Sequence, residues 1–316
     1  MKVLLADKRT AAEDICVFEF VSMDGAPLPA FEAGAHIDVK IADGLVRQYS
    51  LCNAPGETHR YRIGVLRDPA SSRGGSVAMH QLQPGTHVEI SAPRNLFPLD
   101  PDATHTVLIA GGIGVTPILA MAEHLAARGA SFEMHYSTRS PERTAFTDRF
   151  AEPDLQPHTR IYHDVDPEER RIDLGQVVAA PAPGRCLYVC GPAGFIDAVL
   201  ERAKAAGWAD DRLHREYFAA PAQPASACGA FQVRLHRSGQ TIDVAADQSI
   251  VQALAAQGVE IQTACEQGVC GTCLTRVVEG EPEHRDSYLT DEERAANDQL
   301  LPCCSRSRST VIVLDL

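Results

Sequence analysis

The pattern of apolar and polar positions changes twice along the chain. In the first hundred residues, short apolar runs of the β type alternate with turn residues such as Asp24-Gly25 and Pro84-Gly85. These runs span residues 16–21, 36–41, 61–66 and 87–91. Short strands at this spacing are typical of an antiparallel sheet that closes on itself. The pattern therefore predicts an antiparallel β-barrel domain over residues 1–100.

The second part, residues 101–218, alternates strand-like and helix-like segments. Its first strand is continuously apolar, as in a strand buried on both faces, and Gly129 ends the helix that follows. The predicted strands cover residues 107–110, 132–137 and 187–190, and the predicted helices cover residues 118–128 and 193–206. This alternation predicts an α/β domain with a parallel sheet.

The third part follows residues 219–229, a small, uncharged segment with two prolines that we interpret as a linker. In residues 230–316, two strand-like runs flank Ser238-Gly239-Gln240, and Ser249 is a typical N-cap for the helix after it. Thr290 has the capping-box spacing to Glu293, and residues 311–314 read as a closing strand. The pattern predicts a third, smaller domain.

Length and charge narrow the class of protein. The 316 residues allow two or three domains. The 42 acidic and 29 basic residues give a net charge of −13, which argues against a nucleic-acid-binding surface. No run of about 18 apolar residues and no apolar leader is present. We therefore expect a cytoplasmic protein that does not bind membranes, and clustered cysteines there indicate metal or redox chemistry.

Five of the ten cysteines lie close together in the third part. Cys265, Cys270 and Cys273 have the spacing C-x4-C-x2-C, and Cys303 and Cys304 follow about thirty residues later. This is the plant-type spacing of a [2Fe–2S] cluster held by four thiolates. A zinc site, which usually shows two cysteine pairs, and unrelated buried thiols are the alternatives. The spacing leaves the fourth ligand open between Cys303 and Cys304.

A glycine-rich turn follows the first strand of the second part. Gly111-Gly112-Ile113-Gly114-Val115-Thr116-Pro117 places backbone N–H groups at the start of a helix, an arrangement that binds a pyrophosphate. The alternative is that these glycines only permit close packing. Arg139 or Arg143 can accept the 2′-phosphate of NADPH, or can be an ordinary loop arginine, so the residues leave NADH and NADPH open.

A polar strand in the first part can hold a second cofactor. Arg47-Gln48-Tyr49-Ser50-Leu51 places Arg47, Tyr49 and Leu51 on one face and Gln48 and Ser50 on the other. These side chains can hold a phosphate and a flavin ring, or simply form a surface strand. A nicotinamide gives up two electrons together and an iron–sulfur cluster accepts one at a time, so a chain with both sites requires an intermediary such as a flavin.

Four motifs in this order carry a family resemblance over essentially the whole chain. R-x-Y-S-L, G-G-I-G-V-T-P, Cys190-Gly191-Pro192 and C-x4-C-x2-C resemble those of the phthalate dioxygenase reductase family, which includes the vanillate O-demethylase reductases. The resemblance implies an N-terminal flavin barrel of the ferredoxin-reductase type, an NAD-binding α/β domain and a C-terminal β-grasp ferredoxin domain. It also implies FMN rather than FAD, and NADH as the electron donor.

The resemblance assigns residues as well. Cys303, followed by Cys304-Ser305-Arg306, matches the family's fourth cluster ligand beside Cys265, Cys270 and Cys273. Thr116 would lie between flavin and nicotinamide. The implied flavin-binding residues are Arg47, Gln48, Tyr49, Ser50, Val65, Arg67, Gly74, Gly75, Ser76, Thr116 and Phe218, and the implied nucleotide-binding residues are Gly111, Gly112, Gly114, Cys190, Gly191 and Pro192.

The predicted function is a reductase without a catalytic nucleophile or general acid. Electrons pass from NADH through FMN and the [2Fe–2S] cluster to a separate Rieske-type oxygenase, which hydroxylates an aromatic or aliphatic substrate; we expect a monomer. Residues 230–316 hold 13 acids and 7 bases, which suits a basic docking patch on the partner or is simply a solvated surface. The alternatives are a flavin-dependent reductase acting directly on a small molecule, and a redox sensor.

Overall fold

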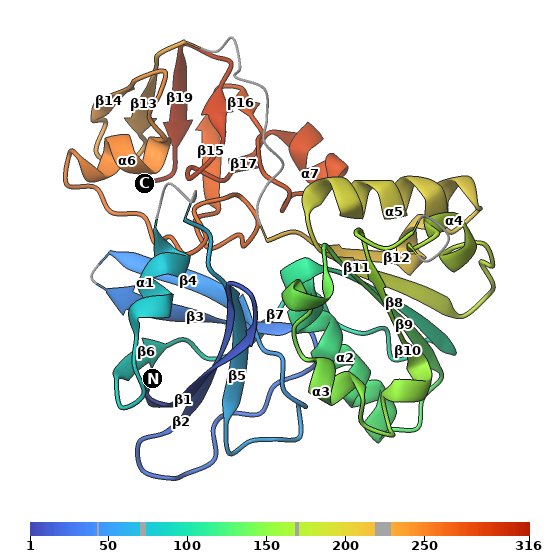
Figure 1. The fold of residues 1–316 in the computed structure, drawn as a ribbon. Helices are drawn as coiled ribbons and strands as arrows, with labels where there is room; N and C mark the ends of the chain where they lie inside the picture. Colours follow the sequence, from blue (N-terminus) through green and yellow to red (C-terminus); the bar gives the residue numbers. More distant parts are fainter. Residues whose placement is uncertain (43, 70–73, 168–170, 219–228) are drawn as a thin grey trace. The chain divides into compact units, whose positions relative to one another are not determined.

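The computed structural model describes residues 1–42, 44–69, 74–167, 171–218 and 229–316 (Figure 1). These residues form two compact units, Met1–Glu216 and Tyr217–Leu316. Of the predicted linker, residues 219–228 lie outside the described residues. No helix in the described ranges is long and apolar enough to cross a membrane.

The first sheet of unit 1 is the predicted antiparallel barrel. Its strands follow the order β4-β3-β6-β1-β2-β5, with β7 paired to β3. A bridge between Leu51 and Ile63 joins the two ends of this path, so the sheet closes. The elements are β1 (Lys2–Ala12), β2 (Ile15–Ser22), β3 (Ala35–Ala42), β4 (Leu45–Ser50), β5 (Tyr61–Leu66), α1 (Gly75–Gln81), β6 (His87–Ile90) and β7 (Arg94–Asn95).

Strand β1 was not among the predicted strands. Its first half alternates, with Val3 and Leu5 fully buried in the barrel core. Its second half carries the charged residues Asp7, Lys8 and Arg9, none of which is buried. They interrupt the alternation of apolar and polar residues by which a strand is recognised. Pairing with β2 supplies the hydrogen bonds that keep this charged segment extended, whereas β6 pairs only with the first residues of β1.

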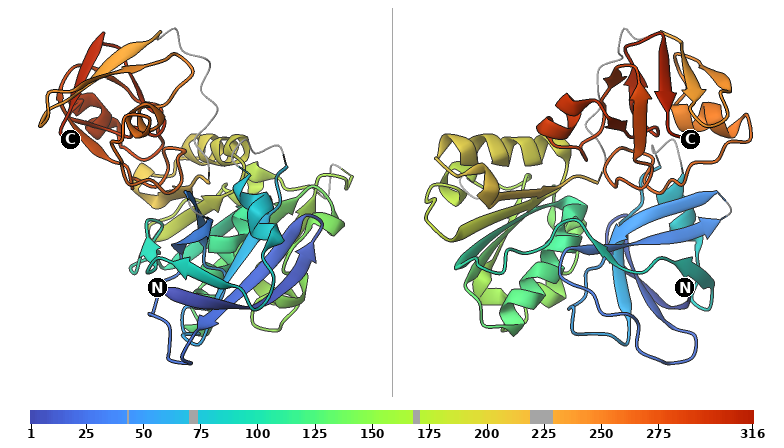
Figure 2. Two further views of the ribbon diagram at one scale, coloured as in Figure 1. Left: turned by 90° about the vertical axis from the view of Figure 1, so that its left-hand side faces the viewer. Right: turned by 180° about the vertical axis from the view of Figure 1, so that it is seen from behind.

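The second sheet of unit 1 is parallel, as the alternation predicted, in the order β10-β9-β8-β11-β12. From the central strand β8, the chain adds β9 and β10 toward one edge of the sheet. It then returns to the centre at β11 and adds β12 at the opposite edge. Right-handed crossovers then place α2 and α5 on opposite faces (Figure 2). The elements are β8 (His105–Gly111), α2 (Val115–Ala127), β9 (Phe132–Thr138), α3 (Thr147–Phe150), β10 (Thr159–His163), α4 (Leu174–Val177), β11 (Arg185–Cys190), α5 (Ala193–Ala205) and β12 (Leu213–Glu216).

The barrel and the parallel sheet share one apolar core. Ile15, Val17 and Cys52 of the barrel belong to the same buried cluster as Leu108 and Ile118 of the sheet and its helix. Polar contacts add to it: the Glu13 N–H donates to the Glu142 carbonyl oxygen at 2.8 Å, and Arg143 pairs with Glu13 at 2.7 Å. These contacts explain why residues 1–216 form a single unit.

Unit 2 is the predicted β-grasp domain. Its sheet has the order β14-β13-β19-β15-β17, in which β13 and β19 run parallel. Ile250 and Leu254 of α6 are buried in its core, and both predicted capping residues, Ser249 and Thr290, form capping boxes. The elements are β13 (Phe231–Leu235), β14 (Thr241–Val244), α6 (Ile250–Ala255), β15 (Thr275–Glu279), β16 (Pro282–Glu283), α7 (Asp291–Ala296), β17 (Gln299–Leu300), β18 (Arg306–Ser307) and β19 (Val311–Leu314).

Candidate functional site

Two glycine-containing turns meet at the point where the strand order of the parallel sheet reverses. One turn follows β8 at Gly111 and forms the short 3-10 helix Gly112–Gly114. The other follows Cys190, the last residue of β11, whose register partner in β8 is Ala110. Open α/β sheets bind ligands in the crevice beyond the carboxyl ends of the strands at such a reversal.

Three glycines of these turns permit close packing between the turns. A Cβ on Gly114 would lie 2.4 Å from the carbonyl carbon and oxygen of Cys190, and a Cβ on Gly191 would lie 3.0 Å from Gly111 Cα. A Cβ on Gly111 would meet Pro192 Cδ at 3.0 Å. The structure thus brings these five predicted nucleotide residues into mutual contact. Gly112, the sixth, has a φ of +53° and would have no atom within 4 Å of its Cβ, so its side of the turn is open.

Thr116 lies where the nucleotide sheet meets the barrel. Its side chain is 1% exposed, and its Oγ1 donates to the Ile113 carbonyl oxygen at 3.1 Å. Its methyl group faces β5, because a Cβ on Gly64 would lie 2.8 Å from Thr116 Cγ2. Thr116 therefore sits between the predicted flavin and nucleotide parts of unit 1.

The site contains a carboxylate that the sequence analysis missed. Glu216 ends β12, and its register partner in β11 is Cys190. The Ser50 Oγ of the barrel donates to Glu216 Oε2 at 3.4 Å. Glu216 therefore links a predicted flavin residue to a predicted nicotinamide residue. The available signal was an acidic residue just before the Tyr217-Phe218 pair, at the carboxyl end of a parallel strand.

Burial changes the protonation of this group. Burial of the carboxyl raises the pKa of Glu216 to about 8, and the hydrogen bond from Ser50 lowers it only in part. The pKa of the Cys190 thiol also lies well above its usual value, because the thiol is buried and because Glu216 lies near it. Near neutral pH both groups are uncharged, and Glu216 carries a proton that it can donate to a hydrogen bond.

Strand β4 carries the predicted flavin residues on two faces. Arg47 and Tyr49 pair with Val39 and Ile37, and Tyr49 packs against the barrel core. Arg47 reaches the start of α1, since a Cβ on Gly75 would lie 2.4 Å from Arg47 Nε. The structure therefore places the Arg47 guanidinium beside Gly75, one of the predicted phosphate residues.

Gln48, on the opposite face of β4, carries a polar atom that fits a ligand. Its Nε2 is buried and has no hydrogen-bond partner within the described ranges. A buried unsatisfied donor costs about 1–3 kcal/mol. A bound ligand with an acceptor oxygen at this position would remove that cost. A flavin ring can supply such an oxygen.

Four further predicted flavin residues are placed less directly. The Val65 side chain is buried in the barrel core, so only its backbone can meet a ligand. Arg67 lies 3.9 Å from Asp14, and the Ser76 Oγ accepts the Asp68 N–H at 3.0 Å. Phe218 belongs to unit 2 and is 36% exposed. Its contact with a flavin stays a prediction.

Of the two arginines considered for a 2′-phosphate, one is already engaged. Arg143 Nη2 lies 2.7 Å from Glu13 Oε1 and 3.5 Å from Asp14 Oδ2, both in the turn between β1 and β2. Arg139 is exposed immediately after β9. Arg143 thus joins the nucleotide sheet to the barrel, and of these two arginines only Arg139 is left exposed beyond the strand.

The predicted cluster ligands come together in unit 2. Cys265, Cys273 and Cys303 are buried and Cys270 is half-buried. The neighbouring Cys270 and Cys303 thiols lower the pKa of Cys265 to about 2, so each of these two thiols lies within hydrogen-bonding reach of Cys265. The pKa of Cys273 is also lowered, chiefly by its contact with the Cys303 thiol.

The loop between Cys265 and Cys273 has the form that a cluster requires. The Gln267 N–H points at Cys265 Sγ at 3.3 Å, and the Thr272 N–H points at Cys270 Sγ at 3.4 Å. Such N–H groups stabilise thiolate ligands and tune cluster potential. Gly268 and Gly271 have φ values of +72° and +70°, the left-handed conformation that permits this tight loop. The residues present therefore fit a [2Fe–2S] cluster.

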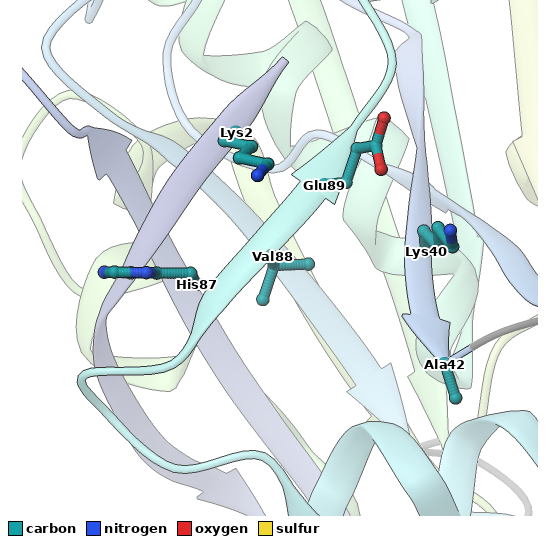
Figure 3. A pocket seen from close by; sticks show the side chains of 6 residues that line it. All are labelled: Lys2, Lys40, Ala42, His87, Val88 and Glu89. Atoms are coloured by element: carbon teal, nitrogen blue, oxygen red, sulfur yellow. The ribbon is translucent and has the colours of Figure 1, made fainter.

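A shallow pocket on the barrel contains none of the predicted site residues (Figure 3). In the sheet register Glu89 of β6 lies opposite both Lys2 of β1 and Lys40 of β3. His87, Val88 and Ala42 complete the lining. Opposite charges in neighbouring strands stabilise a sheet, and we assign no ligand to this pocket.

Two family models match the chain. Residues 233–308 match the 2Fe-2S iron-sulfur cluster binding domain. Residues 91–213 match the N-terminal domain of dimethylamine monooxygenase subunit DmmA-like proteins.

Known proteins match the chain over its whole length. The vanillate O-demethylase oxidoreductase of Pseudomonas sp. is 52% identical over 317 residues, which cover 100% of both chains. The phthalate dioxygenase reductase of Burkholderia cepacia is 40% identical over 318 residues, which cover 100% of this chain and 97% of that protein. A solved phthalate dioxygenase reductase, described as a modular structure for electron transfer from pyridine nucleotides to [2Fe-2S], matches with a TM-score of 0.81 at 40% identity, covering 100% of this chain and 98% of that one. The resemblance drawn from the motifs is thus confirmed, and the chain is an oxidoreductase that belongs to the family of phthalate dioxygenase reductase and the vanillate O-demethylase oxidoreductases.

Proposed function

We propose that the chain is the NADH-dependent reductase component of a Rieske-type oxygenase system and passes electrons through FMN and a [2Fe–2S] cluster. The observation that carries this proposal is the Ser50–Glu216 contact, which joins the predicted flavin strand to the strand edge where the nucleotide turns meet. The names of the relatives, which are reductases of oxygenase systems, support the same partner class.

The flavin part of the proposal rests on the residues around β4 and α1. A bound flavin takes up two electrons together and releases them singly. Arg47, held against Gly75, supplies a guanidinium that can bind the terminal phosphate. Gln48 supplies an amide donor that has no hydrogen-bond partner among the residues that the structure describes, and Ser50 supplies a hydroxyl beside Glu216.

The nucleotide part rests on the two turns. The open side of Gly112 permits close approach of a dinucleotide to the backbone, and Cys190 and Pro192 border the same crevice. We propose NADH as the donor, because Arg143 is already paired with Glu13 and Asp14 and the family resemblance implies NADH. We further propose that the chain acts as a monomer in the cytoplasm, where its clustered thiols stay reduced.

The cluster part rests on Cys265, Cys270, Cys273 and Cys303. When bound, the cluster accepts and releases one electron at a time. The N–H groups of Gln267 and Thr272 point at two of the ligand sulfurs, and burial of three of the four thiols excludes water from most of the site.

Glu216 makes the reaction sensitive to pH. With a pKa of about 8, the carboxyl is neutral below that pH and negatively charged above it. A charge there opposes the negative charge that arrives with a hydride, so flavin reduction by NADH should slow as the pH rises through about 8. Glu216→Gln, a neutral isostere of the acid, should keep the neutral-pH rate within a few-fold and remove this decline. Stopped-flow flavin reduction across that range measures both.

The exposed Glu152→Gln is the matched control and should retain the decline. If Glu216→Gln and the unaltered chain show the same pH profile, Glu216 does not govern the reaction.

A visible spectrum recorded without oxygen tests the proposed function directly. The purified chain should show flavin and iron–sulfur absorption. NADH in slight excess should bleach both, and NADPH should act much more slowly. Absence of flavin absorption, or bleaching by NADPH alone, would contradict the proposal. Rapid steady turnover of a small-molecule acceptor by a cluster-free variant would instead favour a reductase that acts without a protein partner.

A further inference from the structure

Cys304 directly follows the proposed fourth ligand and is not one of the four proposed ligands of the cluster. The Cys304 N–H donates to the Leu301 carbonyl oxygen at 3.2 Å, so residues 301–304 form a tight turn. In a strand, consecutive side chains point to opposite faces. In this turn, both thiols are directed toward the loop that carries Cys265, Cys270 and Cys273.

The Cys304 thiol touches the cluster loop at Gly268. A Cβ on Gly268 would lie 2.5 Å from Cys304 Sγ, so the thiol occupies the space that a side chain there would fill. Gly268 stands between the ligands Cys265 and Cys270 in sequence. Glycine at this position therefore leaves room for a fifth sulfur against the loop.

Cys303 contacts two of the other proposed ligands, Cys265 and Cys273, as well as Cys304. It is buried, and it packs with Cys273, Leu289 and Leu301 in a cluster that Cys304 borders. The pKa of Cys303 is raised by its contacts with Cys265, Cys273 and Cys304. The fourth ligand and its neighbour are thus adjacent to each other and to the loop.

Little holds the Cys304 thiol in its present position. Within the described residues its polar contacts are a 3.7 Å approach to the Leu301 carbonyl oxygen and a 3.8 Å approach to the Ser305 hydroxyl. Hydrogen bonds that involve a thiol are weak. The side chain is half-buried, so it can change rotamer at small cost.

We propose that Cys304 is a reserve ligand, able to take the fourth iron position when Cys303 is absent. The Cys304 thiol gives its proton to water, and its thiolate forms one Fe–S bond in place of the bond that Cys303 would form. The oxidation state of the iron does not change in this exchange. The inference rests on the proposed cluster, and it applies to this position alone, since Cys265, Cys270 and Cys273 have no neighbouring cysteine.

The test uses the full chain with Cys303→Ala, Cys304→Ser and Cys303→Ala/Cys304→Ser. Alanine is chosen for position 303 because, unlike serine, it cannot ligate iron. Iron and acid-labile sulfide per chain measure cluster content, and electron paramagnetic resonance of the reduced protein reports the ligands. Cys304→Ser should match the unaltered chain. Cys303→Ala should keep at least about half of the cluster with an all-sulfur spectrum, and the double variant should keep less than about a tenth.

Equal loss of the cluster in Cys303→Ala and in the double variant would overturn the proposal, and so would equal retention. Failure of Cys303→Ala to accumulate, while Cys304→Ser does, would also overturn it, because a competent reserve ligand preserves the cluster that supports the fold. A cluster missing from the unaltered chain would instead refute the proposed function, so the two failures are distinguishable.

Discussion

Replacing Cys270 by serine should abolish electron delivery to a protein acceptor while direct flavin reduction by NADH persists. Cys270 is a proposed cluster ligand, its Sγ accepts the Thr272 N–H at 3.4 Å, and no cysteine adjoins it in sequence to replace it. Unit 1, which holds the predicted nucleotide residues and every predicted flavin residue except Phe218, contains none of the cluster ligands. We therefore expect acceptor reduction to fall by about a hundredfold or more, with flavin reduction changed less than about twofold.

The two activities are measured separately. Stopped-flow absorbance follows flavin reduction, and a haem protein serves as the external acceptor. Cys16→Ser, a half-buried cysteine of β2 in unit 1, is the matched control and should leave both activities intact. If both activities survive in Cys270→Ser although iron analysis shows the cluster lost, the proposed electron route is wrong.

The second large effect is expected at Gly114. An alanine Cβ there would lie 2.4 Å from the carbonyl carbon and oxygen of Cys190 and 2.5 Å from the Gly191 nitrogen. These are backbone atoms at the end of a central strand, so they cannot rotate away. Overpacking of this kind costs about 1–3 kcal/mol and sometimes more. Gly114→Ala should separate the two turns, destabilise unit 1 and reduce NADH-dependent flavin reduction by at least about tenfold.

Thermal unfolding and the NADH concentration dependence of flavin reduction measure these effects. Gly194→Ala is the control, since a Cβ there would meet no atom within 4 Å and its backbone is not left-handed. It should unfold at the same temperature as the unaltered chain and keep its rate. A Gly114→Ala variant that behaves like Gly194→Ala would show that the contact between the turns has no role in nucleotide use.

Local sequence patterns predicted most of the fold, because they report local physics. The barrel and the parallel sheet follow from periodicity and turn residues, whereas the β-grasp form of the third domain was implied by the family resemblance. The strand at residues 311–314, the N-cap Ser249 and the capping box of Thr290 were predicted at their observed positions. Strand β1 (Lys2–Ala12) was missed where Asp7, Lys8 and Arg9 interrupt the alternation. That charged segment is held extended by its pairing with β2, a contact that its own pattern of apolar and polar residues does not report.

The candidate site was also predicted only where its residues are close in sequence. The cysteine spacing is local, and the loop it predicted carries its N–H groups toward sulfur. Glu216 was missed because its partner Ser50 is 166 residues away, and no spacing rule joins them. The close packing at Gly111, Gly114 and Gly191 could be found only in the structure, since a glycine that admits a ligand and one that admits a neighbouring backbone look identical in a sequence.

The apolar core shared by the barrel and the parallel sheet limits how these domains can be recombined in evolution. Ile15, Val17 and Cys52 are buried in one cluster with residues of the parallel sheet and of α2. A barrel transferred to another chain without its sheet would expose that apolar surface and tend to aggregate. Recombination within residues 1–216 therefore breaks a core, whereas recombination after Glu216 falls between two self-contained cores. The flavin and nucleotide parts are expected to be inherited together, and the cluster domain is free to be gained, lost or moved along the chain.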